Sequence, residues 1–557
     1  MTNFRPRADL ATHEVANQAD PIGDLDAFAG DPILKTHVER ALPGGDPDGQ
    51  AAHLTAFGRE TGAQALRELG RVANENPPAL KAFDRYGQRI DEVEFHPAYH
   101  ALMETGLSGG VSARAWTHPA GGHVAHSALM MLMGWSDDGV CCPMSMTYAV
   151  VPALKRAQWS AEEWAPRVTS AAYDPRTLPA PDKIGATMGM AMTEKQGGSD
   201  VRANTTRAEP LDGSDDEVSL TGHKWFCSAP MCDAFLTLAY EEAGLSCFLV
   251  PRWTPDGQRN AMEIQRLKDK LGDRSNASSE IEYRGAWARR VGEPGRGVRT
   301  IIEMVHHTRL DCIAGSAAQI RRGAAFAAHH AQGRAAFQKK LVDQPLMRAV
   351  LSDLSLEAEA ATALAFLVAE SFDKTLARDE EAAALSRIIT PIAKYWICKR
   401  APGAAYEAME ALGGAGYVEE SGLPRLFRQS PLNAIWEGSG NVIALDVLRA
   451  LNREDAAAEA LKTALRPAAE AHPKLAEWAA WLADPSDSLA KGEASARAWV
   501  ERAALCLQAA VLIERAPQDV ADAFIEARVA DSFLAYGAGT ANVKQDVLIE
   551  RAAVTTA

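Results

Sequence analysis

The stretch VSLTGHKWF, at residues 218–226, decides which fold the chain can adopt. Apolar and polar residues alternate on both sides of Gly222, and this alternation predicts a strand, a turn and a second strand. The stretch SCFLVP (246–251) is typical of a buried strand ended by a proline, and residues 279–283 alternate as well. The region 184–290 is therefore predicted to form a compact β-barrel or sandwich of about 100 residues.

Helical spacing surrounds this β region on both sides. Apolar residues recur every three or four positions from Glu60 to about Ala172, and again after Gly297. The order of helices, strands and helices excludes a doubly wound α/β sheet, and no Gly-x-Gly-x-x-Gly motif lies between a strand and a helix. The sequence predicts a mainly α-helical protein with a central β domain, and its 557 residues are too many for one core.

The charge balance argues against nucleic acid as the main partner. The chain carries 58 Lys and Arg against 73 Asp and Glu, a net charge of −15, whereas phosphate binding needs local positive charge. The Ala-rich helical tail, residues 453–557, is also acidic, with 11 Lys and Arg against 16 Asp and Glu. This tail could be a separate helical module.

The cysteines and apolar runs bear on where the protein works. Eight scattered cysteines include no Cys-x-x-Cys pair and no His partners at zinc-finger spacing, so we expect reduced thiols and no structural metal. No run approaches the roughly 18 apolar residues of a membrane helix, and residues 1–7 lack the apolar stretch of a signal peptide. These features predict a cytoplasmic protein with no membrane partner.

One carboxylate stands in a setting that suits carbon-acid chemistry. In NAIWEGSGN (433–441), Glu437 follows Ile435 and Trp436, which we expect to exclude water, and it precedes two glycines that let a planar ligand approach the backbone. A carboxylate with apolar neighbours has a raised pKa and becomes a usable general base. The alternative is an ordinary solvated Glu in a Gly-rich turn.

Three other segments, far away in sequence, support the first reading. Residues 189–201 place hydroxyls and consecutive glycines in a loop, where backbone N–H groups can meet an anion or a ring carbonyl. Residues 223–229 place an aromatic side chain two positions before a hydroxyl, and residues 407–417 end a helix in a glycine cluster. A tight turn, a half-buried strand and a simple helix cap are the alternatives for these segments.

In this order the segments resemble the signatures of the acyl-CoA dehydrogenase family of flavoproteins. Thr193-Glu194 with Gly198-Ser199-Asp200 is similar to the first family signature, and residues 413–417 with residues 435–438 are similar to the second. The resemblance implies a helical domain, a central β domain and a four-helix bundle. It also implies FAD between the β domain and the bundle, and a homotetramer.

The match is closer to the AidB branch, which is linked to the adaptive response to DNA alkylation. Lys195 and Gln196 depart from the usual Thr-Glu-Pro-Gly pattern, and residues 266–278 are also similar to this branch. The resemblance then extends to nearly the whole chain and implies four domains. They are an N-terminal extension and helical domain (1–183), a β-barrel domain (184–295), a four-helix bundle (296–452) and a C-terminal helical domain (453–557).

The resemblance assigns the catalytic base to Glu437. It would take the α-proton of an acyl-CoA thioester while the β-hydrogen leaves as hydride to flavin N5. Some family members place the base on the helix after the β domain, where this chain has Thr308. Threonine cannot act as that base, which favours Glu437. We expect the neighbouring His306 and His307 to be packing or surface residues.

The resemblance also assigns the residues that bind FAD. Phe226 matches a stacking aromatic, Ser228 a hydroxyl near flavin N5, and Arg334 an arginine that holds the FAD pyrophosphate of a neighbouring subunit. The usual Phe-Gly after this arginine is Phe337-Gln338 here. The full set of expected cofactor-binding residues is Met192, Thr193, Gly198, Ser199, Phe226, Cys227, Ser228, Arg334, Gln344, Gly413, Gly414, Trp436, Gly438, Ser439 and Asn441.

Two functions and a structural role follow from these features. The first function is an FAD-dependent dehydrogenase for short or branched acyl-CoA, with an electron-transfer flavoprotein as the expected acceptor. The second is a DNA-associated flavoprotein with weak or vestigial dehydrogenase activity. Duplex contacts could come from Arg425, Arg428, Arg453, Arg497 and Arg528, although the acidic tail disfavours them. The structural role concerns only the tail, which would cover the surface of the bundle and determine the tetrameric assembly.

Overall fold

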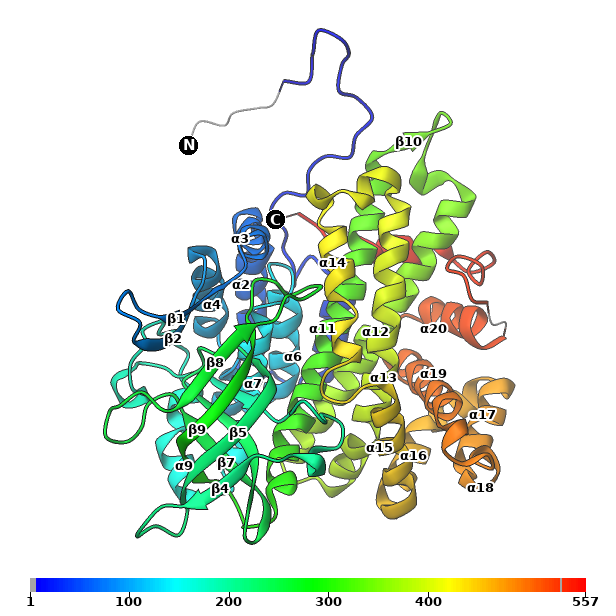
Figure 1. Cartoon of the computed structure of the whole chain (residues 1–557). Helices are drawn as coiled ribbons and strands as arrows, with labels where there is room; N and C mark the ends of the chain where they lie inside the picture. The colour runs from blue at the N-terminus through cyan, green and yellow to red at the C-terminus, as the bar shows by residue number, and fades with distance from the viewer. Residues whose placement is uncertain (1–6, 531–532, 557) are drawn as a thin grey trace.

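The computed structural model describes residues 7–530 and 533–556 and consists of a helical layer, a small barrel and a helical bundle (Figure 1). The prediction about a signal peptide concerns residues 1–7. Of these, only Arg7 lies among the described residues. Among the described helices, none is long and apolar enough to cross a membrane. The predicted class, mainly helical with a central β region, is confirmed.

The N-terminal layer is helical but contains a hairpin that the sequence analysis missed. Strands β1 (Ala79–Phe83) and β2 (Arg89–Glu94) pair antiparallel around a turn at Asp84–Gly87, inside the stretch predicted to be helical throughout. Both strands are largely solvent-accessible, so no buried apolar alternation marks them. The helices of this layer are α1 (Pro32–Ala41), α2 (Gln50–Gly62), α3 (Gln64–Glu75), α4 (Pro97–Ser108), α5 (Arg114–Thr117), α6 (Gly122–Met133), α7 (Cys141–Ala149), α8 (Val151–Leu154), α9 (Gln158–Glu163) and α10 (Ala165–Val168).

The central region closes into a barrel. The order β3-β6-β4-β5-β9-β7 is completed by a pairing of β7 with β6, which leaves β3 and β8 as side branches. These strands are β3 (Met188–Ala191), β4 (Arg207–Pro210), β5 (Glu217–Ser228), β6 (Ala234–Glu241), β7 (Gly244–Pro251), β8 (Met262–Leu267) and β9 (Ser278–Arg290). Closure explains why β6 and β7 are almost entirely buried, since each faces the barrel core and the helices outside it.

The strand–turn–strand prediction for residues 218–226 is wrong, because these residues form one continuous strand. β5 pairs with β9 along its whole length, with register shifts after Leu220 and Lys224. Gly222 is needed for close approach: a Cβ built there would lie 2.7 Å from the Thr206 Cα. The glycine marks a crowded point in a bulged strand.

The bundle is built on three long helices that run side by side. They are α11 (Gly297–Gly333), α12 (Pro345–Leu376) and α13 (Glu380–Ala411). The chain turns at the far end of α13 and returns through α14 (Leu423–Gln429) to α15 (Gly440–Arg453) beside the barrel (Figure 1). A two-stranded hairpin, β10 (Ala335–Ala336) with β11 (Lys339–Lys340), projects between α11 and α12.

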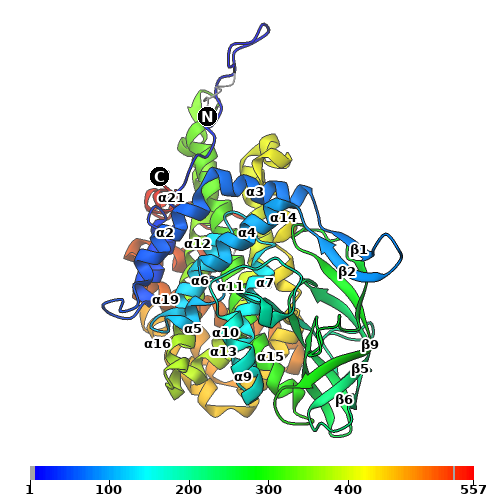
Figure 2. The same ribbon diagram turned by 90° about the vertical axis from the view of Figure 1, so that its left-hand side faces the viewer.

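The tail packs on the bundle. Trp499 is fully buried, and Arg528 forms ion pairs with Asp353 and Glu357 of α12. The tail helices are α16 (Asp455–Ala471), α17 (Pro473–Ala483), α18 (Pro485–Ser488), α19 (Ala496–Arg515), α20 (Gln518–Ile525) and α21 (Gln545–Ala552). Near the C-terminus, Thr556 forms a β-bridge with Leu25, so the last helix α21 lies next to the helical layer (Figure 2). The tail therefore packs against the bundle.

Candidate active site

Glu437 lies in a tight turn between the returning segment and α15. Its φ is +57°, a left-handed conformation that costs a non-glycine residue about 1–2 kcal/mol. Gly438 follows at φ +102°. Such strain persists only where the surroundings hold it, and it concentrates at functional sites.

Two buried cations hold this turn by its carbonyl groups. Lys394 of α13 donates to the carbonyl oxygens of Trp436 (2.8 Å) and Gly438 (2.5 Å), and its side chain is almost fully buried. Arg309 of α11 donates to the carbonyl oxygen of Glu437 at 3.1 Å. Three consecutive carbonyls are thus fixed from the bundle, which holds the backbone of the turn in place.

The Glu437 carboxylate is placed to act as a base. Burial raises its pKa, while the hydrogen bond from Thr308 and the charges of Lys394 and Arg309 partly offset the rise. Thr308 Oγ1 donates to Oε2 of Glu437 at 2.8 Å. Thr308, the residue at the alternative base position, therefore orients Glu437.

The water-excluding role predicted for the two residues before Glu437 is only half right. Trp436 is half-buried, and its indole N–H donates to Asn433 at 2.9 Å. Ile435 is 62% exposed. The burial of Glu437 comes instead from α7, α11 and α13, which no local sequence pattern could reveal.

One thiol of the helical layer is affected both by a barrel residue and by Glu437. Burial raises the pKa of Cys142 on α7 to about 12; a hydrogen bond with Ser228 lowers this pKa and the charge of Glu437 raises it. Ser228, at the end of β5, and Glu437 therefore both lie near Cys142. The sequence analysis assigned Cys142 no role.

The end of β5 presents the expected aromatic and hydroxyl on one face. Phe226 is 50% exposed and Ser228 is half-buried, two residues apart as strand geometry requires. Cys227 points the other way and its side chain is fully buried in the barrel. Its predicted cofactor contact is therefore limited to backbone atoms.

A buried ion pair anchors the loop that carries Met192, Thr193, Gly198 and Ser199. Glu194 forms a fully buried ion pair with Lys224 at 2.8 Å, and this lowers the pKa of Glu194 to about 2 against the effect of burial. A Cβ at Gly198 would lie 2.8 Å from the Thr193 hydroxyl, so the loop packs closely against itself. Met192 and Thr193 are half-buried, whereas Gly198 and Ser199 are exposed.

A hollow of about 430 Å³ opens beside the Glu437 turn. It is lined by Ser439 and Asn441, at the start of α15, and by the cations Lys399 and Arg497. Arg497 comes from the tail helix α19 and donates to Asn441 at 2.9 Å. A helix N-terminus with two cations favours phosphate groups.

The remaining predicted cofactor residues lie elsewhere. Arg334 is 26 residues beyond Thr308 on α11 and its C-cap, which places it about 39 Å along the helix axis. Gly413 and Gly414, just beyond α13, are about 28 Å from Lys394 by the same rise per residue. Arg334 donates to the carbonyl of Asn17 at 2.5 Å, and Gln344 donates to that of Ala336 at 2.9 Å.

Two histidines beside Thr308 have no part in this geometry. Burial lowers the pKa of His306 to about 3 and that of His307 to about 4, so both are neutral near pH 7. His306 stacks on Phe372 with ring centroids 4.6 Å apart. Their placement agrees with the packing role expected for them.

A metal centre finds no support in the described residues, where no three His, Cys, Asp or Glu side chains come together to hold an ion. The eight cysteines are free thiols.

Comparison with known proteins places this geometry in a family. Three family models match along the chain: the adaptive response protein AidB N-terminal domain (17–175), the acyl-CoA dehydrogenase middle domain (189–286) and the acyl-CoA dehydrogenase C-terminal domain (295–452). The chain belongs to the acyl-CoA dehydrogenase family, and within it to the AidB branch.

The relatives agree with this placement. AidB of Escherichia coli (strain K12) is 47% identical over 80% of this chain and 81% of its own length. Acyl-CoA dehydrogenase family member 11 of Caenorhabditis elegans is 32% identical over 77% of this chain and 71% of its own. The crystal structure of C. elegans ACDH-11 in complex with C11-CoA superposes with a TM-score of 0.82 at 26% identity, over 99% of this chain and 94% of that chain. The fold also matches a Bacillus anthracis acyl-CoA dehydrogenase complexed with FAD, with a TM-score of 0.66 at 15% identity, over 90% of this chain and 88% of that one.

Proposed function

We propose that this chain is an FAD-dependent acyl-CoA dehydrogenase for short or branched acyl groups, with Glu437 as the catalytic base. The observation that carries the proposal is the Glu437 turn itself. A carboxylate with a raised pKa is held in a strained conformation by Thr308, Arg309 and Lys394. General bases of carbon acids need such a raised pKa to work near neutral pH.

The proposed reaction removes two hydrogens from the acyl chain. The Glu437 carboxylate takes the proton from the α-carbon, and the electron pair of that C–H bond forms the new α,β double bond. Bound FAD would accept the hydride that leaves the β-carbon. Thr308 and Lys394 keep the carboxylate in place, and the partial burial of the turn limits competing water.

The residues present fit a flavin nucleotide. The exposed ring of Phe226 offers a stacking surface, and Ser228 and the Thr193–Ser199 loop offer hydroxyl and backbone donors. Lys399, Arg497 and the start of α15 offer positive charge for phosphates. An acyl-CoA is a reasonable substrate because the relative from C. elegans was crystallised with C11-CoA.

The separation of Arg334 from Glu437 supports an oligomer with shared sites. A ligand that touches Glu437 cannot reach, along the same α11 helix, a residue about 39 Å away. We propose that Arg334, Gln344, Gly413 and Gly414 complete the cofactor site of a neighbouring subunit in a homotetramer. An electron-transfer flavoprotein is the proposed acceptor, as the family implies.

The alternative, a DNA-associated flavoprotein, has less support. Of the five arginines considered for duplex contacts, Arg428 pairs with Glu419 at 2.6 Å, and Arg528 pairs with Asp353 and Glu357. Guanidinium groups held in this way are less available to phosphates. A gel shift at low salt with micromolar protein would revive the alternative if a discrete complex formed.

An anaerobic titration tests the proposal. We expect isovaleryl-CoA to bleach the flavin absorbance of the purified yellow protein, and Glu437→Gln to keep the flavin bound but oxidised. A flavin that stays oxidised in the parent protein with every acyl-CoA tried would contradict the proposal.

A further inference from the structure

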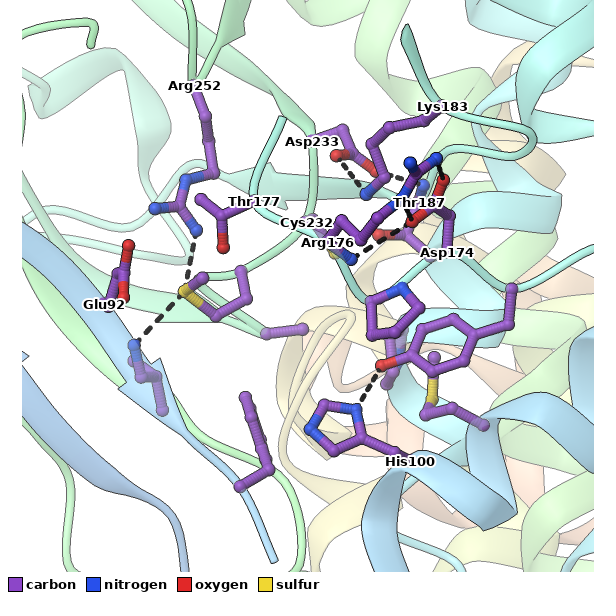
Figure 3. A pocket seen from close by; sticks show the side chains of 18 of the residues that line it. Glu92, His100, Asp174, Arg176, Thr177, Lys183, Thr187, Cys232, Asp233 and Arg252 are labelled. Carbon is purple, nitrogen blue, oxygen red and sulfur yellow. Dashed lines mark hydrogen bonds and ion pairs between the residues drawn. The ribbon is translucent and has the colours of Figure 1, made fainter. Parts of the chain in front are cut away.

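A cavity of about 330 Å³ lies between the N-terminal layer and the barrel, apart from the Glu437 turn (Figure 3). Its walls come from the β1–β2 hairpin, helix α4, the connection 173–187 and barrel residues next to β6 and β7. Of the described residues that line it, none belongs to the predicted flavin or acyl-CoA sites.

The carboxylates of this cavity are already neutralised. Four carboxylate side chains line it, and each has a cation beside it. The pairs are Lys183–Asp233 (2.6 Å), Arg176–Asp174 (2.6 Å), Arg259–Glu92 (2.5 Å) and Lys81–Glu94 (2.8 Å).

Arg252 is a lining cation whose side-chain hydrogen bonds all go to neutral groups. Its side chain is buried, with the residue only 8% exposed, and its guanidinium donates to the carbonyl oxygens of Pro230 (3.4 Å) and Asp91 (3.2 Å) and to the sulfur of Met231 (2.7 Å). Burial lowers the pKa of Arg252 to about 10. The carboxylates of Asp233, Glu92 and Asp91 favour the charged form of Arg252 without forming an ion pair with it, so a carboxylate that hydrogen-bonds directly to this buried guanidinium would be bound strongly.

The cavity also has an apolar side suited to the body of a ligand. Phe95 stacks on Tyr99 with ring centroids 4.0 Å apart, and Met103 lies beside them. His100 lies on the same side of the cavity, and its Nδ1 is 2.8 Å from the Tyr173 hydroxyl. Figure 3 shows Arg252 and His100 on opposite sides of the space.

We propose that this cavity binds a small organic carboxylate. The carboxylate would pair with the Arg252 guanidinium, and an aromatic or branched aliphatic body would pack on Phe95 and Tyr99. The site would be independent of the dehydrogenase reaction, because it uses none of the residues proposed for that reaction.

Isothermal titration calorimetry on the flavin-containing protein tests the proposal, with 3-phenylpropionate as the probe. We expect one site per chain, and binding at least about tenfold weaker for 3-phenylpropionamide, which lacks the charge. Arg252→Met should weaken binding of the acid by a similar factor. Arg284→Met, which removes an exposed guanidinium whose partners Glu263 and Glu282 do not line the cavity, should change the affinity less than about twofold.

A second measurement keeps the proposal testable if Arg252→Met fails to fold. Trp253 lines the cavity, so the acid should change its fluorescence in the parent protein and not in Trp253→Phe. No binding at 10 mM, equal binding of acid and amide, or competition with a saturating acyl-CoA would each overturn the proposal.

Discussion

The two ends of helix α11 differ in how many hydrogen bonds and ion pairs their side chains form. At the barrel end, Thr308 and Arg309 bond to Glu437, and Arg309 also pairs with Asp446 at 2.7 Å. At the other end, Arg334 bonds to one backbone carbonyl, and Phe337 in the adjoining hairpin is 94% exposed.

This difference assigns the proposed reaction to the barrel end of α11 and the proposed subunit contact to its hairpin end. At the barrel end, the proposed base and the groups that hold it come together within one chain. The hairpin end is strained, with φ of +50° at Phe337 and +64° at Gln338, and it presents its side chains outward. Such a region is explained most simply if a neighbouring subunit covers it.

The largest expected effect is the loss of chemistry at the barrel end. Glu437→Gln should slow anaerobic flavin reduction by about 10²–10⁴-fold, the usual contribution of a general base, without loss of bound FAD. Stopped-flow absorbance with isovaleryl-CoA measures the rate. Glu459→Gln, on an exposed face of α16, is the matched control and should leave the rate unchanged.

The hairpin end should show the opposite behaviour. Arg334→Met should weaken FAD binding about 10–100-fold by removing a charge-assisted contact, while the reduction rate per bound flavin is kept. Equilibrium dialysis of FAD measures the affinity. A slower rate at full flavin occupancy would place Arg334 in the chemistry and remove the contrast between the two ends.

Mixed oligomers sharpen the comparison. If each site takes Glu437 from one subunit and Arg334 from its neighbour, randomly mixed Glu437→Gln and Arg334→Met chains should recover about a quarter of the parent activity at limiting FAD. Mixing Glu437→Gln with Glu437→Ala is the control and should recover none. Failure of the first mixture to exceed its parents would contradict a shared site.

A smaller effect is expected on stability from the turn that holds Glu437. Lys394→Met leaves two carbonyl groups without their buried donor and should destabilise the protein by about 2–4 kcal/mol. Differential scanning calorimetry would show a lowered Tm. Lys399→Met makes the same substitution on the same helix, at an exposed position. It should lower the Tm much less.

The smallest effect concerns pH. The base form of Glu437 is lost as pH falls through its raised pKa, so flavin reduction should decline on the acid side. Thr308→Val removes a hydrogen bond that lowers this pKa, so the decline should begin at higher pH, with a rate about two to ten times lower on the acid limb. An unchanged kcat/KM profile would show that Glu437 is not the titrating group.

The sequence predicted the parts of the fold and site that depend on local pattern. Regular apolar spacing marked the helices on both sides of the β region, and the Gly-rich stretch around Glu437 marked the candidate base. The hairpin β1–β2 was missed because its half-exposed strands lack a buried face. Gly222 was taken for a turn because crowding by Thr206, a long-range contact, leaves no local signal.

The rest of the site depends on partners distant in sequence. Lys394 lies 42 residues before Trp436 and Arg309 lies 128 residues before Glu437, so only the folded bundle brings them to the turn. Either cation, read on its own helix, looks like a surface residue. The separation of Arg334 from Glu437 also depends on the fold, because Glu437 is held by Thr308 of α11 whereas Arg334 lies at the C-terminal end of that helix.

Exchange of the substrate α-proton with solvent tests the role of Glu437 most directly. Acyl-CoA incubated anaerobically with the flavin-containing protein in D₂O and then recovered can be analysed by mass spectrometry. Deuterium at the α-carbon with the parent protein, and none above background with Glu437→Gln, is the expected result. Equal incorporation by both proteins would contradict Glu437 as the base.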